Sequence, residues 1–243
     1  QYIHNYEYIA QIRIFMAIID EVNSLKHIVL SGIPIIVIES TEEKRVTQLL
    51  KELALVMKVP LQGWTITQGL RRLDTERKVM PVKDVHEPES VLKHIKKSVR
   101  PSIYVLFDFH VHLKDDPYTQ RMLKEVAMSN VGQSGKNILV LVGHQIDPAQ
   151  DIRRYVAKFE LTLPNHQELE QLVKEEAVNW ARNNNGKRVK TENSTLKRLV
   201  DNLRGLNYGD ARRLVRKIIW DDGAITEDEL PKLNKAKFEL MDM

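Results

Sequence analysis

The sequence predicts an α/β fold, with a parallel five-stranded sheet flanked by helices and a small all-α domain after it. Apolar runs rich in β-branched residues alternate with stretches of helical periodicity as far as Pro164, and such alternation is typical of a parallel sheet. After Pro164 only helical periodicity continues. The chain has 243 residues, of which 42% are hydrophobic, and this is enough to bury one large core and one small core.

The alternation begins with a helix and continues with the first of five strands. Apolar side chains recur at helical spacing over residues 6–30, and Ser31 and Gly32 end that pattern. The five predicted strands are short apolar runs that end at turn residues or at a helix start. They cover residues 33–38, 61–67, 103–110, 138–142 and 157–163.

Helix-start signals separate these strands. Thr41 is a capping residue followed by acids, and it predicts a helix that continues to about residue 57. Pro88 and Pro117 open two further helices, because proline is favoured in a first helical turn. Residues 69–87 are polar and irregular, so we expect a surface excursion there.

Four helical stretches follow Pro164 and form the small all-α domain. They cover residues 166–182, 194–203, 208–220 and 226–240. Turn residues separate several of them, including the run of three asparagines that begins at Asn183. The expected organisation is therefore an amino-terminal helical segment over residues 1–30, an α/β subdomain over residues 31–164 and a helical lid over residues 165–243.

Composition limits the classes of function. The net charge is +4 and charged residues make up 29% of the chain, which allows an anionic partner without requiring one. There is no cysteine, so a disulfide framework and a thiolate zinc site are excluded, and a reducing cytoplasmic location is expected. The longest apolar runs are too short to span a bilayer. The sequence begins with Gln1 and stops inside a helical pattern, so we expect it to be part of a longer protein.

One carboxylate stands at the end of the third strand pattern. Five apolar residues from Ile103 lead directly to Asp108, and ligands in open α/β sheets gather at the carboxyl ends of strands. An apolar run that ends in an acid is also the form of a magnesium-binding strand in nucleotide hydrolases, where a following Glu activates water. Here Phe109 follows. The stretch therefore has the architecture of an ATPase strand without its general base.

The segment after the first strand lacks the chemistry of a phosphate-binding loop. Such a loop needs glycines that let backbone N–H groups turn onto the phosphates, together with a Lys and a Ser or Thr. Residues 39–44 read Glu-Ser-Thr-Glu-Glu-Lys, with no glycine and with three carboxylates that would repel a triphosphate. Lys44 alone is positioned to imitate the phosphate-loop lysine. The sequence predicts that this chain does not hydrolyse ATP.

Several segments resemble the AAA+ ATPase superfamily. Residues 158–173 (KFELTLPNHQELEQLV) resemble its fifth strand and the entry into its lid, and residues 209–213 (GDARR) resemble a lid-helix segment. A closer resemblance is to the degenerate amino-terminal module of the chloroplast-reading-frame (ycf-type) AAA ATPases of plastids and bacteria. It rests on residues 33–46 (IPIIVIESTEEKRV), residues 63–70 (GWTITQGL) and residues 108–110 (Asp-Phe-His).

The resemblance implies a P-loop NTPase fold with degenerate Walker motifs and a set of remnant nucleotide-site residues. That set is Lys44, Asp108, His144 and Arg212. Arg153 and Arg154 stand where the family places the arginine that reaches a neighbour's nucleotide. No catalytic residue, metal ligand or cofactor is implied for this chain, whereas ATP and magnesium are expected for the parent protein. A homo-oligomeric ring is expected, with a protein client that the sequence does not identify.

Two other classes of function stay open. Asp108, His110 and His112 have the Asp-x-His-x-His spacing of metal-dependent hydrolases, in which alternate residues on a strand project two imidazoles toward one metal. That strand would normally come first in a barrel, and here it is the third of five. Four basic clusters, at residues 71–72, 77–78, 187–190 and 212–217, suggest nucleic-acid binding. No aromatic residues interleave these clusters, which makes nucleic acid an unlikely partner, and no membrane partner is expected.

Overall fold

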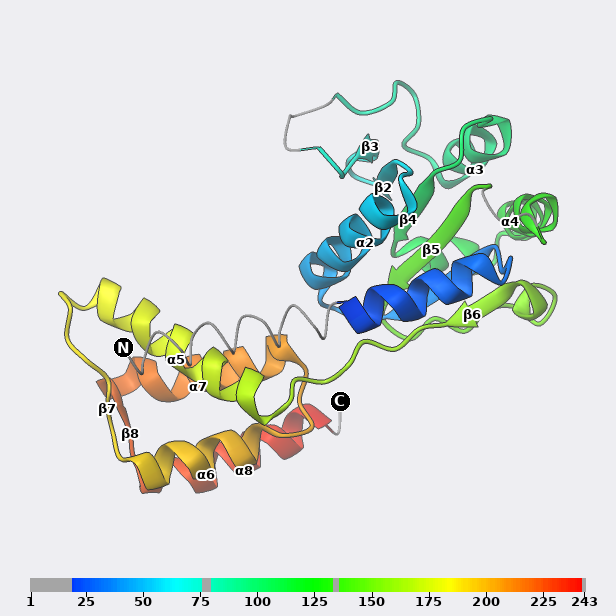
Figure 1. The fold of residues 1–243 in the computed structure, drawn as a ribbon. Helices are drawn as coiled ribbons and strands as arrows, with labels where there is room; N and C mark the ends of the chain where they lie inside the picture. The colour runs from blue at the N-terminus through cyan, green and yellow to red at the C-terminus, as the bar shows by residue number, and fades with distance from the viewer. Residues whose placement is uncertain (1–18, 76–79, 133–135, 242–243) are drawn as a thin grey trace. The chain divides into compact units, whose positions relative to one another are not determined.

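The computed structural model describes residues 19–75, 80–132 and 136–241 of the chain (Figure 1). They form two compact units, one that ends at Leu161 and one that begins at Thr162. We call them the α/β unit and the helical unit. The finer division into segments 1–30, 31–164 and 165–243 stays a prediction, and residues 1–18 lie outside the described residues.

A six-stranded, mostly parallel sheet organises the α/β unit, which confirms the predicted fold class. The strand order is β3-β2-β4-β5-β1-β6, and only β3 runs antiparallel to its neighbour. The strands are β1 (Ile35–Glu39), β2 (Leu61–Thr65), β3 (Gly69–Arg72), β4 (Ile103–Phe107), β5 (Ile138–Gly143) and β6 (Val156–Lys158). Because β1, β4 and β5 are parallel neighbours, their carboxyl ends meet at one edge of the sheet.

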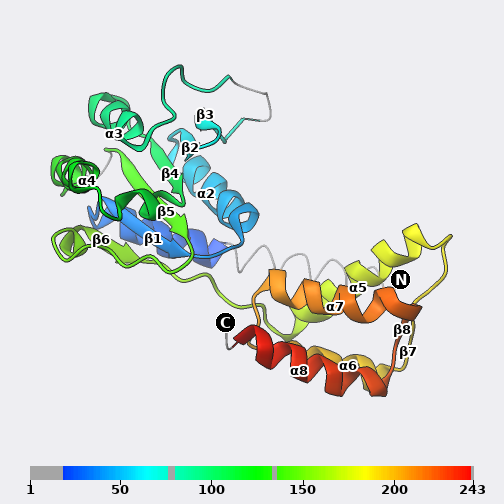
Figure 2. The ribbon, with the colours of Figure 1, turned by 180° about the vertical axis from the view of Figure 1, so that it is seen from behind.

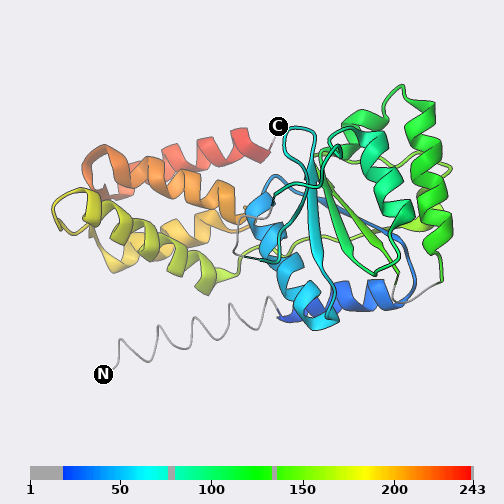
Figure 3. The ribbon, with the colours of Figure 1, turned by 90° about the horizontal axis from the view of Figure 1, so that it is seen from above.

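Helices cover both faces of this sheet (Figures 2 and 3). The helix over residues 19–30 and α2 (Glu43–Met57) pack on one face, and α3 (Pro88–Lys97) and α4 (Pro117–Asn130) pack on the other. Alternate residues of each strand divide between the two cores, as the pleat requires. In β1, for example, Ile36 and Ile38 face α2, while Ile35 and Val37 face α3 and α4.

Strand β3 was not predicted, and the expectation of an irregular excursion is wrong for its residues. Leu70 is fully buried, whereas Arg71 and Arg72 are exposed, so only half of this short strand is apolar. Gly69 begins it with a φ of +66°, a conformation that glycine adopts without strain. Its outer edge is covered, because the N–H of Leu70 donates to the carbonyl of Val85 at 3.0 Å.

Two of the predicted strands end three or more residues before their predicted ends. The strand predicted over residues 103–110 ends at Phe107, because Asp108 adopts the left-handed conformation with a φ of 52°, which Asp tolerates better than most residues. The 3₁₀ helix η1 (Phe109–Leu113) follows it. The strand predicted over residues 157–163 ends at Lys158, although the N–H of Phe159 still donates to the carbonyl of Val37 at 2.8 Å.

The helical unit consists of α5 (His166–Asn183), α6 (Asn193–Leu203), α7 (Tyr208–Asp222) and α8 (Leu230–Met241), at or near the predicted positions. A capping box fixes the start of α5, because Asn165 accepts from the N–H of Glu168 while Glu168 accepts from the N–H of Asn165. The two-residue strands β7 (Lys190–Thr191) and β8 (Ala224–Ile225) pair in parallel. They were not predicted, because two residues carry no periodic pattern.

No helix among the described residues is long and apolar enough to cross a membrane. The cytoplasmic location expected from the sequence stays a prediction.

Candidate functional site

The carboxyl ends of β1, β4 and β5 bring three of the polar residues of interest to one edge of the sheet. Glu39 is the last residue of β1, Asp108 follows β4 and His144 follows β5. Backbone hydrogen bonds join these ends, because the N–H of Asp108 donates to the carbonyl of Val142 at 2.8 Å and the N–H of Ser40 donates to that of Gly143 at 3.0 Å. This edge is where an α/β sheet would hold a ligand.

The Glu39 carboxylate occupies the tip of β1 and is itself bound. Its Oε1 accepts a hydrogen bond from the N–H of Ile146 at 2.9 Å. The ammonium of Lys158, at the end of β6, lies 3.4 Å from the same oxygen. A backbone N–H and an ammonium are the groups that bind an anion. Here the N–H of Ile146 and the ammonium of Lys158 are both directed at the carboxylate of Glu39.

The connection from β1 to α2 is too short to wrap around a phosphate. Only Ser40, Thr41 and Glu42 separate the end of β1 from the start of α2. The Ser40 hydroxyl accepts from the N–H of Glu42 at 3.0 Å, so this donor is used within the loop. Glu43 lies in the first turn of α2, and the exposed Lys44 follows it. Two carboxylates, those of Glu42 and Glu43, therefore stand at the amino end of α2, and the guanidinium of Arg45 lies 3.6 Å from Glu42.

His110 packs tightly against Gly143 beside Asp108. A Cβ atom at Gly143 would lie 2.5 Å from Cε1 of His110 and 3.2 Å from a carboxylate oxygen of Asp108. The Nδ1 atom of His110 is buried and has no hydrogen-bond partner in the part of the chain that the structure describes. The Asp108 side chain is exposed. The imidazole thus acts as a packing group against the end of β5.

The metal-hydrolase alternative is not supported. Asp108 is in the left-handed region, while His110 and His112 lie on η1 instead of a strand, so the imidazoles do not alternate on one face. The ring of His112 packs edge-on against Trp64 with a centroid distance of 5.8 Å. Among the described residues, no group of three or more His, Asp or Glu side chains is placed to hold a metal ion.

Arg153 and Arg154 lie on the 3₁₀ helix η2 (Arg153–Tyr155), which follows the loop after β5. The guanidinium of Arg153 donates to the carboxylate of Asp147 at 2.9 Å and to the carbonyl of Pro148 at 3.1 Å. Arg154 is exposed. A hydrogen bond from Lys124 holds the pKa of Asp151 below its usual value, and the charge of Arg154 adds to this effect. The two arginines therefore stand on a loop ordered by its own ion pairs.

The same loop forms one wall of a cavity of about 470 Å³, which η1 and α4 close on the other side. The cavity is lined by both charged and apolar side chains. Its Lys124 binds Asp151 at 2.9 Å, and its Asp147 binds Arg153 at the same distance. These pairs neutralise much of the charge of the cavity wall.

Arg212 lies on α7, and all its contacts that the structure gives are within the helical unit. Its guanidinium binds Glu175 of α5 at 3.2 Å and lies equally close to Glu176. Arg216, one turn later, donates to Glu176 at 2.6 Å, and this hydrogen bond raises the pKa of Arg216. Glu176 is nearly fully buried. These ion pairs join α5 to α7, and no spacing in the sequence indicated them.

The basic clusters of the nucleic-acid alternative are partly neutralised in the same way. Arg72 binds Asp74 at 2.6 Å, and Arg213 lies 3.6 Å from Asp210. Arg77 and Lys78 lie outside the described residues. Among the described residues, the exposed side chains of Lys187, Arg188 and Lys190 have no ion pair, so this cluster is not neutralised.

Comparisons with known proteins agree with this architecture. A family model described as the N-terminal domain of SpoVK-like AAA ATPases matches residues 21–161, and a model described as their second domain matches residues 167–243. No curated protein matches the chain. The resemblance to AAA+ ATPases found in the sequence is confirmed.

Solved structures of RuvB from Thermotoga maritima are also similar. A proline-to-glycine mutant of RuvB is 13% identical over 83% of this chain and 61% of that one, with a TM-score of 0.46. An alanine-to-serine mutant is 12% identical over 89% of this chain and 68% of that one, with a TM-score of 0.48. The chain thus spans less than two thirds of the length of the first of these RuvB chains. On the family models, which together match most of its length, the chain belongs to the SpoVK-like AAA ATPases and carries their N-terminal and second domains.

Proposed function

We propose that this chain is a nucleotide-silent AAA+ module of a larger AAA ATPase, which serves oligomeric assembly and regulates ATP hydrolysis carried by another module. One observation carries the proposal. The anion-binding groups at the tip of β1, the N–H of Ile146 and the ammonium of Lys158, bind the Glu39 carboxylate. The chain thus supplies its own anion at the place where an active module would hold a phosphate.

Electrostatics opposes a triphosphate at this position. Hydrolysis of ATP requires cations and N–H donors preorganised around the transferred phosphoryl group. Glu39, Glu42 and Glu43 instead place three carboxylates at the end of β1 and the start of α2, and the nearby cations Lys158 and Arg45 pair with Glu39 and Glu42. Two like charges about 4 Å apart repel by roughly 4 kcal/mol near a protein surface. A bound triphosphate would therefore meet repulsion where an active site gives attraction.

The position of the general base supports the same conclusion. The residue after Asp108 is Phe109, which is fully buried and packs edge-on against Trp64 at a centroid distance of 5.4 Å. A buried aromatic ring cannot activate water. We therefore treat Lys44, Asp108, His144 and Arg212 as remnants of a degenerate nucleotide site with no catalytic role.

The assembly part of the proposal rests on the family and on one surface. The matched models are described as the N-terminal and second domains of these ATPases, and we expect a further domain of the parent protein to bind ATP and magnesium. Arg153 and Arg154 are candidates for contact with a neighbouring subunit in a homo-oligomeric ring. Arg153 is 60% exposed and is held by Asp147, so it is preordered for such a contact without nucleotide.

The claim that this chain does not hydrolyse ATP, which we call the silent part of the proposal, is tested by measuring ATP turnover of the purified chain with magnesium. We expect no turnover above background, and no change in Asp108→Ala. Asp115→Ala is the matched control, because Asp115 is also exposed and also has a positive φ, of 60°. Turnover that is lost in Asp108→Ala and kept in Asp115→Ala would refute the proposal.

A further inference from the structure

The helical unit has an apolar groove that none of its own helices fills. Its volume is about 350 Å³, and α5, β7, α6 and β8 form its walls. Val178 of α5 lines it and is 50% exposed. The other apolar residues of the lining are Val173, Ala177, Ala181, Val189, Leu196 and Ile225. A half-exposed apolar groove of this kind is suited to an apolar side chain from outside.

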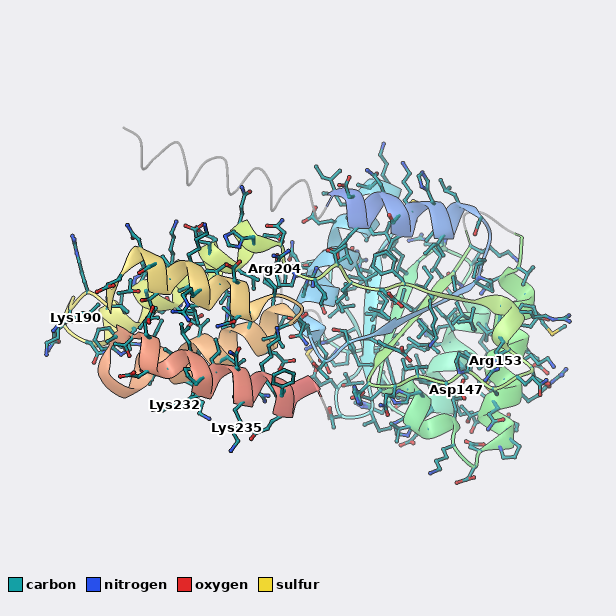
Figure 4. The ribbon with its side chains drawn as sticks, turned by 90° about the horizontal axis from the view of Figure 1, so that it is seen from below. Asp147, Arg153, Lys190, Arg204, Lys232 and Lys235 are labelled. Atoms are coloured by element: carbon teal, nitrogen blue, oxygen red, sulfur yellow. The ribbon has the colours of Figure 1, made fainter. Side chains whose placement is uncertain are left out.

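The charged residues of the groove are both cations. Lys174 binds Glu170 of its own helix at 2.8 Å. Among the described residues, Arg188 has no hydrogen-bond or ion-pair partner, and it is exposed at the rim. Lys187 and Lys190 are also exposed on this segment, and Figure 4 shows Lys190 at one end of the helical unit. The occupant should therefore combine an apolar anchor with negative charge.

The end of α8 has this combination. Phe238 is 67% exposed, and the next residue, Glu239, is exposed as well. Lys237 donates to the carbonyl of Asn202 at 3.0 Å and to that of Arg204, so the last turns of α8 are fixed on the end of α6. Phe238 is thus presented to solvent beside an exposed acid, on an ordered part of α8.

The groove and Phe238 lie at opposite ends of the helical unit. Figures 1 and 3 show α8 running from the end with β7 and β8 toward the other end. A helix of 12 residues extends about 18 Å. Phe238 of one copy therefore does not reach the groove of the same copy, whereas Phe238 of a second copy can.

We propose that the end of α8 of one copy docks into the groove of a second copy, with Phe238 as the apolar anchor and Glu239 facing Arg188. Because the two surfaces differ, the contact is head-to-tail and generates a ring or an open series of copies. The contact deepens the assembly part of the proposed function and rests on it. The silent part does not depend on it.

The anchor is tested by sedimentation of the full chain over a range of concentrations. Phe238→Ala should raise the dissociation constant of self-association at least about tenfold, because buried aromatic anchors dominate small interfaces. Leu55→Ala is the matched control, since Leu55 is 72% exposed in the α/β unit and does not line the groove. Phe238 is exposed, so the variant should keep the circular dichroism of the parent chain.

The ion pair is tested by a charge exchange. Arg188→Glu and Glu239→Arg should each weaken self-association about tenfold, and the double variant should restore it to near the wild-type value.

Unchanged association in Phe238→Ala and in both single exchanges would overturn the contact. If Arg153→Ala weakens self-association instead, the chain still assembles, but through the surface that carries Arg153. A chain that stays monomeric at every concentration would refute both this contact and the assembly part of the proposed function, while ATP turnover judges the silent part separately.

Discussion

At the scale of single residues, Glu39 has a role that its position in the sequence did not reveal. The sequence indicated that its carboxylate would repel a triphosphate. The structure adds that this carboxylate accepts the N–H of Ile146 and pairs with Lys158. These partners are 107 and 119 residues away along the chain, so no local pattern predicts them. Glu39 therefore also fastens the loop that leads to Arg153.

We predict that Glu39→Ala destabilises the chain by about 1–2 kcal/mol, because the N–H of Ile146 loses a charged acceptor. The pair with Lys158 adds little, since Glu39 is 41% exposed and Lys158 is 56% exposed. Urea unfolding measures the loss, and amide hydrogen exchange at Ile146 should accelerate. Glu160→Ala, which removes an exposed acid two residues after Lys158, should be neutral. Equal effects of the two substitutions would contradict the role assigned to Glu39.

The contact of His110 with Gly143 gives a second prediction at this scale. Gly143→Ala should destabilise the chain by about 1–3 kcal/mol, because the added Cβ would lie 2.5 Å from the imidazole. In a His110→Ala background the same substitution should cost much less, since the clash is removed. Denaturant unfolding of both single variants and the double variant measures this coupling. Additive effects would show that the imidazole does not limit the space at Gly143.

At the scale of elements, prediction succeeded where a whole element is apolar or carries a start signal. Strands β1, β4 and β5 are continuous apolar runs, and α3 and α4 begin at the predicted Pro88 and Pro117. The cap predicted at Thr41 is wrong, because the N-cap of α2 is Glu42, which makes no side-chain cap hydrogen bond. Prediction failed where tertiary partners decide the structure. Strand β3 is recognisable only through its pairing with β2, and η1 exists because Asp108 turns the chain out of the sheet.

For the candidate site, the sequence predicted which residues lie at the sheet edge but not the contacts of Arg212. The order of the strands placed Asp108 and His144 at one sheet edge, because parallel strands end together. The contacts of Arg212 were not predictable, since Glu175 and Glu176 lie on a different helix. Arg212 is a structural link between α5 and α7 in this unit.

The ion pair between Arg72 and Asp74, at the end of β3, predicts that the free energy of unfolding depends on pH. The hydrogen bond from Arg72 lowers the pKa of Asp74 in the folded chain. A carboxyl with a lowered folded pKa stabilises the fold above its unfolded pKa, and this contribution is lost as the pH falls through the folded pKa. Asp74→Asn should therefore cost up to about 1 kcal/mol at pH 7, and this cost should shrink below about pH 4 and vanish as the pH falls through the lowered folded pKa. The free energy of unfolding against pH measures this. Asp84→Asn, which changes an exposed acid near the same strand, is the control for the substitution itself, and a cost of Asp74→Asn that does not change with pH would contradict the assignment.

At the scale of the whole molecule, the chain belongs to an AAA+ family, and the anion-binding groups at the tip of β1 bind the carboxylate of Glu39. The family models match residues 21–161 and 167–243, so the likeness extends over both units. In the proposed assembly, the α/β unit contributes the loop that carries Arg153 and Arg154, and the helical unit contributes the apolar groove and the end of α8. In this account the chain assembles through surfaces that are ordered without nucleotide.

Direct binding of nucleotide tests the central claim most directly. We measure binding of ATP with magnesium to the purified chain by isothermal titration calorimetry, with Lys44→Ala and Lys51→Ala as matched lysine variants of α2. The account predicts no binding tighter than about 1 mM, a free energy of roughly −4 kcal/mol, for all three proteins. Micromolar binding that is lost in Lys44→Ala and kept in Lys51→Ala would contradict it.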